Sequence, residues 1–170
     1  MPDHVYLWHP IFVHFTLALL CTSALLFVAA RLVPAQEWHR RLISGAELNL
    51  WGGTALTLLT VAFGWLAFSS VPHDDAAHPV MELHRALALA TFGWFVAVAL
   101  LSVWLRRRAP YPSIPFLLAL GVGVAGLVGT GIRGGEHVYQ HGVAVDSKPS
   151  SDTPAAAPAP PGHEGHHHHH

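Results

Sequence analysis

The sequence is poor in charged residues. Only 11% of its 170 residues are Asp, Glu, Lys or Arg, whereas 52% are hydrophobic. In a typical soluble domain about a quarter of the residues are charged, so this composition argues against a water-soluble protein. The charge-free segments are also long enough to matter, because about 20 apolar residues suffice to cross the hydrocarbon core of a bilayer. Four such segments occur, at residues 4–30, 48–73, 86–105 and 109–132.

These apolar runs are continuous and do not alternate with polar residues, which favours helices over the strands of a barrel. A helix also satisfies its own backbone hydrogen bonds where no water is available. We therefore predict an all-α integral membrane protein, a four-helix bundle with spans at about 6–32, 44–70, 79–105 and 113–135. The transmembrane domain would cover residues 1–145. Residues 146–170 are rich in Pro, Ala and Ser, and we expect a disordered tail that ends in a purification tag at 166–170.

Cysteine is almost absent. Cys21, in the first span, is the single cysteine, which excludes an internal disulfide, covalent haem attachment through two cysteines, and a cysteine zinc site. Before the tail at 146–170, the chain also lacks a phosphate-binding glycine loop, a His-Glu-x-x-His and a Gly-x-Ser-x-Gly motif. We therefore expect no hydrolytic or group-transfer enzyme with its own substrate.

The arginines predict the orientation. Arg31, Arg40 and Arg41 separate the first two spans, and a run at 106–108 separates the last two. Short loops with this excess face the cytoplasm. Both termini would then lie outside the bacterial inner membrane. The first residues lack the positive region of a signal peptide, so we expect the first span to be kept.

Histidine is the informative polar residue. Nine histidines precede the tail, and under this orientation only His39 lies at the cytoplasmic side. Histidine within a span is costly and therefore a functional pointer. His14 lies inside the first span, and His84 lies at a comparable depth on the third, about 7 Å along the axis past Pro79.

The sequence also resembles a known family. His-Pro-Ile-Phe-Val-His-Phe at 9–15, His84 at the opening of the third span, and Gly-Gly-Glu-His-Val-Tyr-Gln-His-Gly at 134–142 are similar to motifs of a four-span bacterial membrane family, domain of unknown function 2231. The resemblance covers about residues 4–145. It implies that the histidines at positions 9, 14, 84 and 141 matter. Members joined to cytochrome-like modules add an implication of redox chemistry.

The leading hypothesis is a b-type haem protein for electron transfer, with the haem held by imidazoles of facing helices near the outer face. His14 and His84 are the expected axial ligands. Arg85 and Arg133 would pair with the haem propionates, because a guanidinium matches a carboxylate at two points, or they would reach the headgroups. A quinone or a periplasmic cytochrome would be the redox partner, and small residues in spans two and four would allow a homo-oligomer.

Two alternatives remain open. One is a transition-metal site for zinc or copper, whose ligands would be His9, His14, His84 and His141. The other is a structural or scaffold subunit, in which the imidazoles bond to one another and to backbone carbonyls and no cofactor is bound.

Overall fold

The computed structural model describes residues 8–70, 78–107 and 111–141, and within them all side chains but those of 67, 70, 78–80 and 136–141. Four helices make up this part of the chain, which confirms the all-α prediction. Their bounds are α1 Trp8–Leu32, α2 Gln36–Ser70, α3 His78–Leu105 and α4 Ile114–His141. Three of them have a proline in the first turn, where a missing N–H leaves no hydrogen bond unmade: Pro10, Pro79 and Pro115.

Two helices extend beyond the predicted spans. α2 begins at Gln36, well before the apolar run, where Glu37 pairs with Arg41 one turn later. α4 continues through Gly134 to His141. The length of an apolar run indicates which part of a helix is compatible with lipid. The helix itself can continue past that run where its polar side chains have partners.

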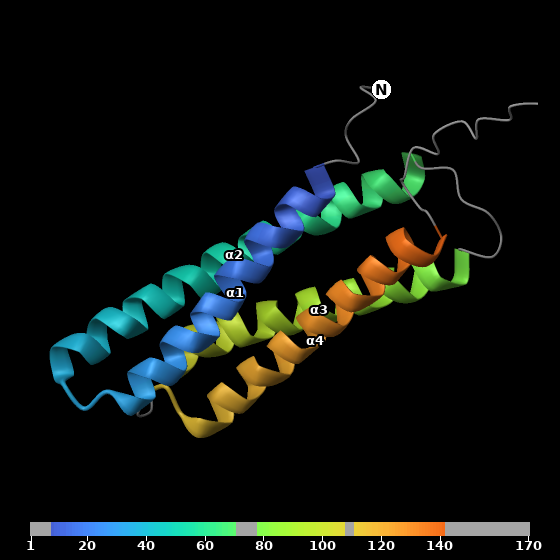
Figure 1. The fold of residues 1–170 in the computed structure, drawn as a ribbon. Coiled ribbons are helices and arrows are strands. Elements are labelled where there is room, and N and C mark those ends of the chain that lie inside the picture. Colours follow the sequence, from blue (N-terminus) through green and yellow to red (C-terminus); the bar gives the residue numbers. More distant parts are fainter. Residues whose placement is uncertain (1–7, 71–77, 108–110, 142–170) are drawn as a thin grey trace, which may run out of the picture.

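The predicted number of apolar spans is slightly off. Among the described residues, three helical segments are long and apolar enough to cross a membrane: Trp8–Leu32, Met81–Leu105 and Ile114–Gly135. α2 is the longest helix, but its threonines and the Gly52–Gly53 pair lower its hydropathy. It nevertheless packs along α1 as the second arm of a hairpin (Figure 1).

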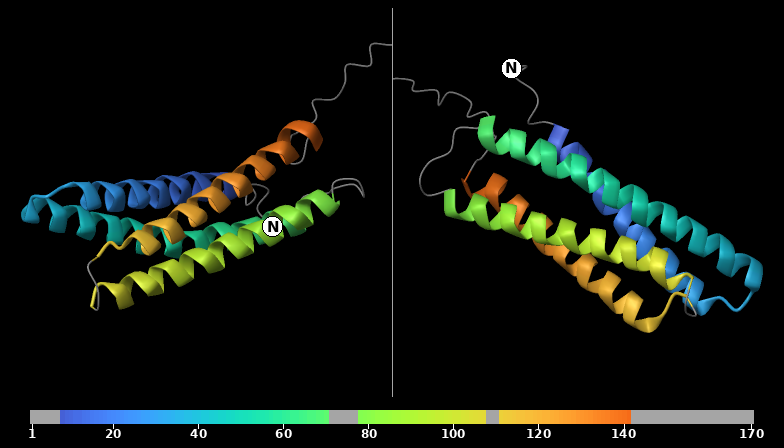
Figure 2. Two further views of the ribbon diagram at one scale, coloured as in Figure 1. Left: turned by 90° about the horizontal axis from the view of Figure 1, so that it is seen from below. Right: turned by 180° about the vertical axis from the view of Figure 1, so that it is seen from behind.

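The bundle consists of two hairpins, α1 with α2 and α3 with α4, and Figure 2 shows them from two further directions. α1 contacts α2 and α4, and α3 contacts the same two helices. Within the described residues α1 and α3 do not contact each other, so they lie diagonally across the bundle. We call the end with Arg31, Arg40 and Arg106 the arginine end, and the end with His9 and His84 the histidine end.

The buried core lies toward the arginine end. Phe27 packs its ring edge against Phe116 at 5.0 Å and against Tyr111 at 5.5 Å between ring centroids. Such perpendicular pairs add to the free energy of burial. The eight residues of the core cluster come from all four helices: Leu20, Phe27, Ala46, Leu50, Phe95, Val98, Phe116 and Leu120.

The two hairpins repeat the same stripe of inward residues. On α1 the stripe begins at His9 and continues through Thr16, Leu20, Ser23 and Phe27. On α3 the same spacing leads from His84 to Thr91, Phe95, Val98 and Ser102. Steps of seven, four, three and four residues keep one helix face toward its partner. α1 and α3 both run from the histidine end, so a rotation about the long axis of the bundle relates the hairpins.

The contacts between the arms of each hairpin repeat as well. Thr16 Oγ1 of α1 lies 2.9 Å from Thr60 Oγ1 of α2. At the equivalent place Thr91 Oγ1 of α3 lies 3.3 Å from Thr130 Oγ1 of α4. Hydroxyl pairs of this kind join helices in membranes, where packing and hydrogen bonds replace the hydrophobic drive.

Small residues let the arms approach closely at a second equivalent place. A Cβ added to Gly53 would lie 2.8 Å from Cδ2 of Leu20, and one added to Gly123 would lie 3.0 Å from Cζ of Phe95. The first distance is shorter than carbon atoms adopt, and the second is tight enough that the Phe95 ring would have to shift. Glycine therefore lets a large side chain of the partner arm cross close to the backbone of α2 and of α4.

Candidate histidine site

His9 lies between the arms of the first hairpin. Its Nδ1 is 3.0 Å from the carbonyl oxygen of Thr60, and its ring rests on Gly64, where an added Cβ would lie 2.9 Å from Cε1. A carbonyl only accepts hydrogen bonds, so Nδ1 carries the proton. In a neutral ring, Nε2 then holds the lone pair through which an imidazole can bind a metal ion.

His84 occupies the equivalent place in the second hairpin. Its half-buried ring rests on Gly134 of α4, where an added Cβ would lie 3.1 Å from Cε1. The spacing along the chain is the same in both hairpins: each histidine precedes the inward threonine by seven residues, and each glycine follows the partner threonine by four. His9 and His84 are thus structural equivalents on diagonal helices.

His14 lies elsewhere on α1. The residue is exposed, and its Nδ1 lies 2.6 Å from the carbonyl oxygen of Pro10, within the same helix. Five residues after His9 correspond to a turn of about 140° around the helix, which moves His14 off the inward stripe. The position equivalent to His14 on α3 is Leu89. The expected axial pair, His14 and His84, therefore does not occupy equivalent places.

The two arginines expected near a cofactor have different surroundings. Arg85 forms an ion pair with Glu82 at 2.7 Å, and its guanidinium lies over the rings of Trp65, at 5.2 Å, and Phe68, at 5.5 Å, on α2. A cation over an aromatic face is attracted by the ring. Arg133 is exposed on α4, directly before Gly134. Contact of either arginine with a propionate remains a prediction.

The four-histidine metal site gains no support from this geometry. His141 lies in α4, but its side chain is outside the described part of the chain. Among the described residues no three His, Cys, Asp or Glu side chains gather where they could hold a metal ion. Three of the four expected ligands, His9, His14 and His84, are described and do not form such a group.

The comparison with protein families decides the identity. Residues 8–147 match the model of DUF2231, described as a predicted membrane protein. The chain belongs to the DUF2231 family. This confirms the resemblance seen in the histidine motifs, and the match spans all four helices of the bundle. No curated protein and no solved structure matches the chain. Membership establishes a DUF2231 membrane protein and assigns it no activity.

The repeat within this DUF2231 chain was not anticipated from its sequence, although a signal is present. The pattern His-x6-Thr occurs at His9–Thr16 and again at His84–Thr91. The pattern Gly-x6-Thr-x3-Gly occurs at 53–64 and again at 123–134. Apart from these few positions the two halves differ in sequence, so the repeat is evident only once the contacts are known.

Proposed function

We propose that this DUF2231 protein is a b-type haem protein of the membrane that transfers electrons, with His9 and His84 as the axial ligands. The observation that carries the proposal is the equivalence of these two histidines on diagonal helices. A planar group on the bundle axis needs one ligand on each of its faces, and two equivalent hairpins offer one each. Four-helix bundles hold cofactors between facing helices in this manner.

The chemistry of the donors supports the proposal. The backbone carbonyl that accepts from Nδ1 of His9 orients the ring and selects the tautomer whose Nε2 binds iron, as backbone carbonyls do at metal sites. Gly134 admits the ring of His84 close to the α4 backbone. Two imidazoles would fill both axial positions of the iron, which suits transfer of single electrons and leaves no open position for oxygen.

The remaining residues have supporting roles in this proposal. Arg133, exposed one residue before Gly134, would pair with a propionate near the surface. Arg85 is engaged by Glu82, so it would first have to exchange that carboxylate for a propionate. With the histidine end outside the bacterial inner membrane, a quinone or a periplasmic cytochrome would exchange electrons with the site.

A visible spectrum tests the proposal. The protein is expressed in haem-replete cells, the residues 166–170 are removed, and spectra are recorded oxidised and reduced. We expect the absorption bands of a low-spin bis-imidazole haem, lost in His9→Ala and in His84→Ala. His39→Ala at the arginine end serves as the control and retains the bands. A colourless protein in all preparations would overturn the proposal.

The His14→Ala variant tests which histidine is opposite His84. We expect it to retain the bands, because His14 is exposed and bonds to Pro10 of its own helix. Loss of the bands in His14→Ala with retention in His9→Ala would instead support the pair His14 and His84. Metal analysis of the same samples tests the alternative of zinc or copper, which would be stoichiometric in the unaltered chain and lost with the histidines.

A structural role is the second candidate, and the bond from His9 to Thr60 favours it. An imidazole that donates to a carbonyl of the neighbouring helix joins two helices without any cofactor. Under this alternative, His9→Ala and His84→Ala lower the unfolding temperature of a colourless, metal-free protein. Stability and colour together therefore separate the two candidates.

A further inference from the structure

A polar pocket of about 340 Å³ lies at the arginine end, remote from the histidines. It is formed by the start of α2, the end of α3 and the segment that precedes α4. Its lining combines two arginines, one carboxylate, three other polar side chains and one isoleucine. The residues are His39, Arg40, Ile43, Ser44, Glu47, Arg106 and Tyr111.

Two buried polar atoms in this pocket are unsatisfied. Glu47 is only 7% exposed. Its Oε2 accepts a hydrogen bond from Nη1 of Arg106 at 2.9 Å, but its Oε1 has no partner among the described residues. The buried hydroxyl of Tyr111 has none there either. A buried carboxylate oxygen without a donor costs free energy, so the pocket favours a ligand that donates hydrogen bonds.

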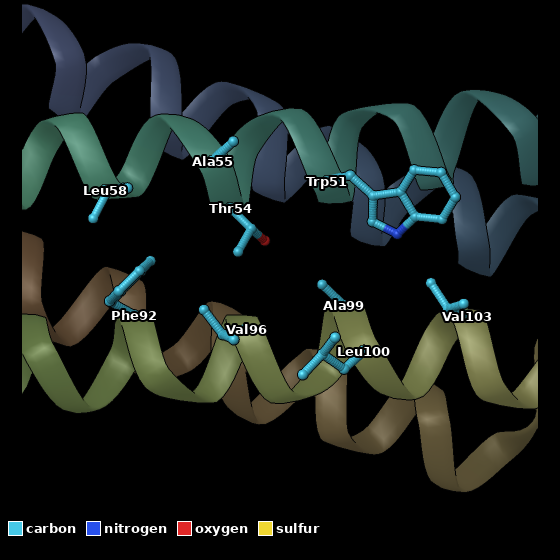
Figure 3. Close-up of a pocket in the computed structure, with 9 residues that line it drawn as sticks. All are labelled: Trp51, Thr54, Ala55, Leu58, Phe92, Val96, Ala99, Leu100 and Val103. Carbon is cyan, nitrogen blue, oxygen red and sulfur yellow. The ribbon is translucent and has the colours of Figure 1, made fainter.

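An apolar groove of about 400 Å³ lies between α2 and α3. Figure 3 shows side chains of α2 and α3 facing each other across it. Thr54 contributes the polar hydroxyl of this lining, and that hydroxyl already donates to the carbonyl of Leu50. The lining residues are Trp51, Thr54, Ala55, Leu58, Phe92, Val96, Ala99, Leu100 and Val103.

The pocket and the groove follow one another along the line where α2 and α3 face each other, which we call the seam. On α2, Glu47 of the pocket is one turn from Trp51 of the groove, and Arg106, directly after the end of α3, follows Val103 of the groove by three residues. The guanidinium of Arg106 lies over the ring of Trp51 at 5.6 Å, and Nε1 of Trp51 donates to Oγ of Ser102 at 3.1 Å. Trp51 thus stands where the polar pocket meets the apolar groove.

The dimensions of this seam match one leaflet of a bilayer. From Glu47 to Leu58 α2 rises about 16 Å, at about 1.5 Å per residue. Half of the hydrocarbon core of a bilayer is about 15 Å thick. A tryptophan at the junction fits the same picture, because its ring favours the boundary between headgroups and hydrocarbon.

We propose that this seam binds one phospholipid whose headgroup carries an ammonium group with N–H donors, as ethanolamine does. The phosphate pairs with Arg40, the exposed guanidinium of the pocket, and with the half-exposed Arg106. The ammonium donates to Oε1 of Glu47 and to the hydroxyl oxygen of Tyr111, and an acyl chain lies in the groove. The site is independent of the haem proposal, since it shares no residue with the histidine end.

Competition between two lipids tests the headgroup. The purified protein in detergent receives phosphatidylethanolamine or phosphatidylcholine with identical acyl chains, and native mass spectrometry measures the lipid retained. Both lipids are zwitterionic, but choline has no N–H to donate. A hydrogen bond to a charged group contributes enough for about a tenfold preference for ethanolamine. Equal retention of the two lipids would overturn the proposal.

Matched variants locate the preference. Glu47→Gln should abolish it, whereas Glu37→Gln, which removes an exposed carboxylate of the same helix, should leave it unchanged. If Glu47→Gln does not fold, Tyr111→Phe replaces it and should weaken the preference. Identical preferences in the pocket variant and in the Glu37→Gln control would contradict the assignment of the site.

The groove has its own test. Ala55→Phe should fill it and reduce retention of both lipids, while Ala18→Phe, at an exposed position of α1, should not. Free phosphoethanolamine at the same concentration should fail to displace the lipid, because it lacks the acyl chain. Displacement by this soluble headgroup, or full retention in Ala55→Phe, would show that the groove holds no acyl chain and would overturn the lipid proposal.

Discussion

His84 occupies in the second hairpin the place that His9 occupies in the first. Each ring rests on a glycine of the partner arm, Gly134 for His84 and Gly64 for His9, and each histidine lies on the inward stripe of its helix. The equivalence places the two imidazoles on diagonal helices at one end of the bundle. It is the reason that the proposed ligand pair differs from the pair expected from depth in the sequence.

The glycines on which the histidine rings rest should respond to substitution by alanine differently from glycines that have open space around them. Gly64→Ala and Gly134→Ala add a methyl group that must displace an imidazole. Gly52→Ala and Gly131→Ala meet nothing within 4 Å, so they gain helix propensity of about 0.5–1 kcal/mol. We expect the open positions to raise the unfolding temperature in detergent and the histidine positions to lower it. The same response at all four positions would contradict the close packing of the rings.

The threonine pairs should couple across the helices. In a double-mutant cycle of Thr16→Val and Thr60→Val, the coupling free energy should be near 0.6 kcal/mol, about the mean for such bonds in membranes. The pair Thr91 and Thr130 has a longer contact and should couple less. Thr54 bonds within its own helix, so a cycle of Thr16→Val with Thr54→Val is the control. Denaturant unfolding in mixed micelles measures these values, and equal coupling in the control would contradict the hydroxyl bridge.

The orientation predicted from the arginines is open to a labelling experiment. In a Cys21→Ser background, Ala35→Cys introduces a thiol at the arginine end, and Asp3→Cys introduces one before α1. We expect a membrane-impermeant thiol reagent applied to spheroplasts to label position 3 and to leave position 35 unlabelled until the membrane is opened. The reverse labelling pattern would mean that the histidine end faces the cytoplasm.

Tyr111 should make the protein sensitive to alkali. Burial, together with the nearby negative charge of Glu47, raises the pKa of the Tyr111 hydroxyl well above its usual value. An unfolded tyrosine loses its proton near pH 10. Above that pH the unfolded state binds fewer protons than the folded state, so the free energy of unfolding falls as pH rises.

Replacement of the hydroxyl tests this alkaline effect. Tyr111→Phe should lose no stability between about pH 9 and 11, since phenylalanine has no hydroxyl that ionises in the unfolded state. Unfolding temperatures across this range provide the measurement. A parallel decline in Tyr111→Phe would assign the effect to another group.

Much of the fold could be predicted from the distribution of charge. The long gaps without charge predicted the helices, and α1 and α3 lie close to their expected bounds. The polar beginning of α2 and the glycine-containing end of α4 could not be predicted in this way, because hydropathy measures suitability for lipid and not helix length. α2 itself illustrates the point, since it is the longest helix and the least apolar.

The candidate sites were predicted less completely. His9 and His84 were both among the expected ligands, but depth along the chain did not distinguish His9 from His14. The polar pocket at the arginine end was not expected at all, because Glu47 and Arg106 are 59 residues apart and each has an ordinary local sequence. An ion pair between helices depends on how the helices are rotated and aligned, which local patterns do not record.

The sequence by itself determined that this chain is helical and lies in a membrane, because a segment without charge or water must satisfy its own backbone hydrogen bonds. It also determined where the arginines and histidines fall along the chain. Only the tertiary structure decided which histidine faces inward and which carboxylate is buried. Both depend on the rotation of one helix against its neighbour, and that rotation is set by the glycines and threonines where the arms of each hairpin meet.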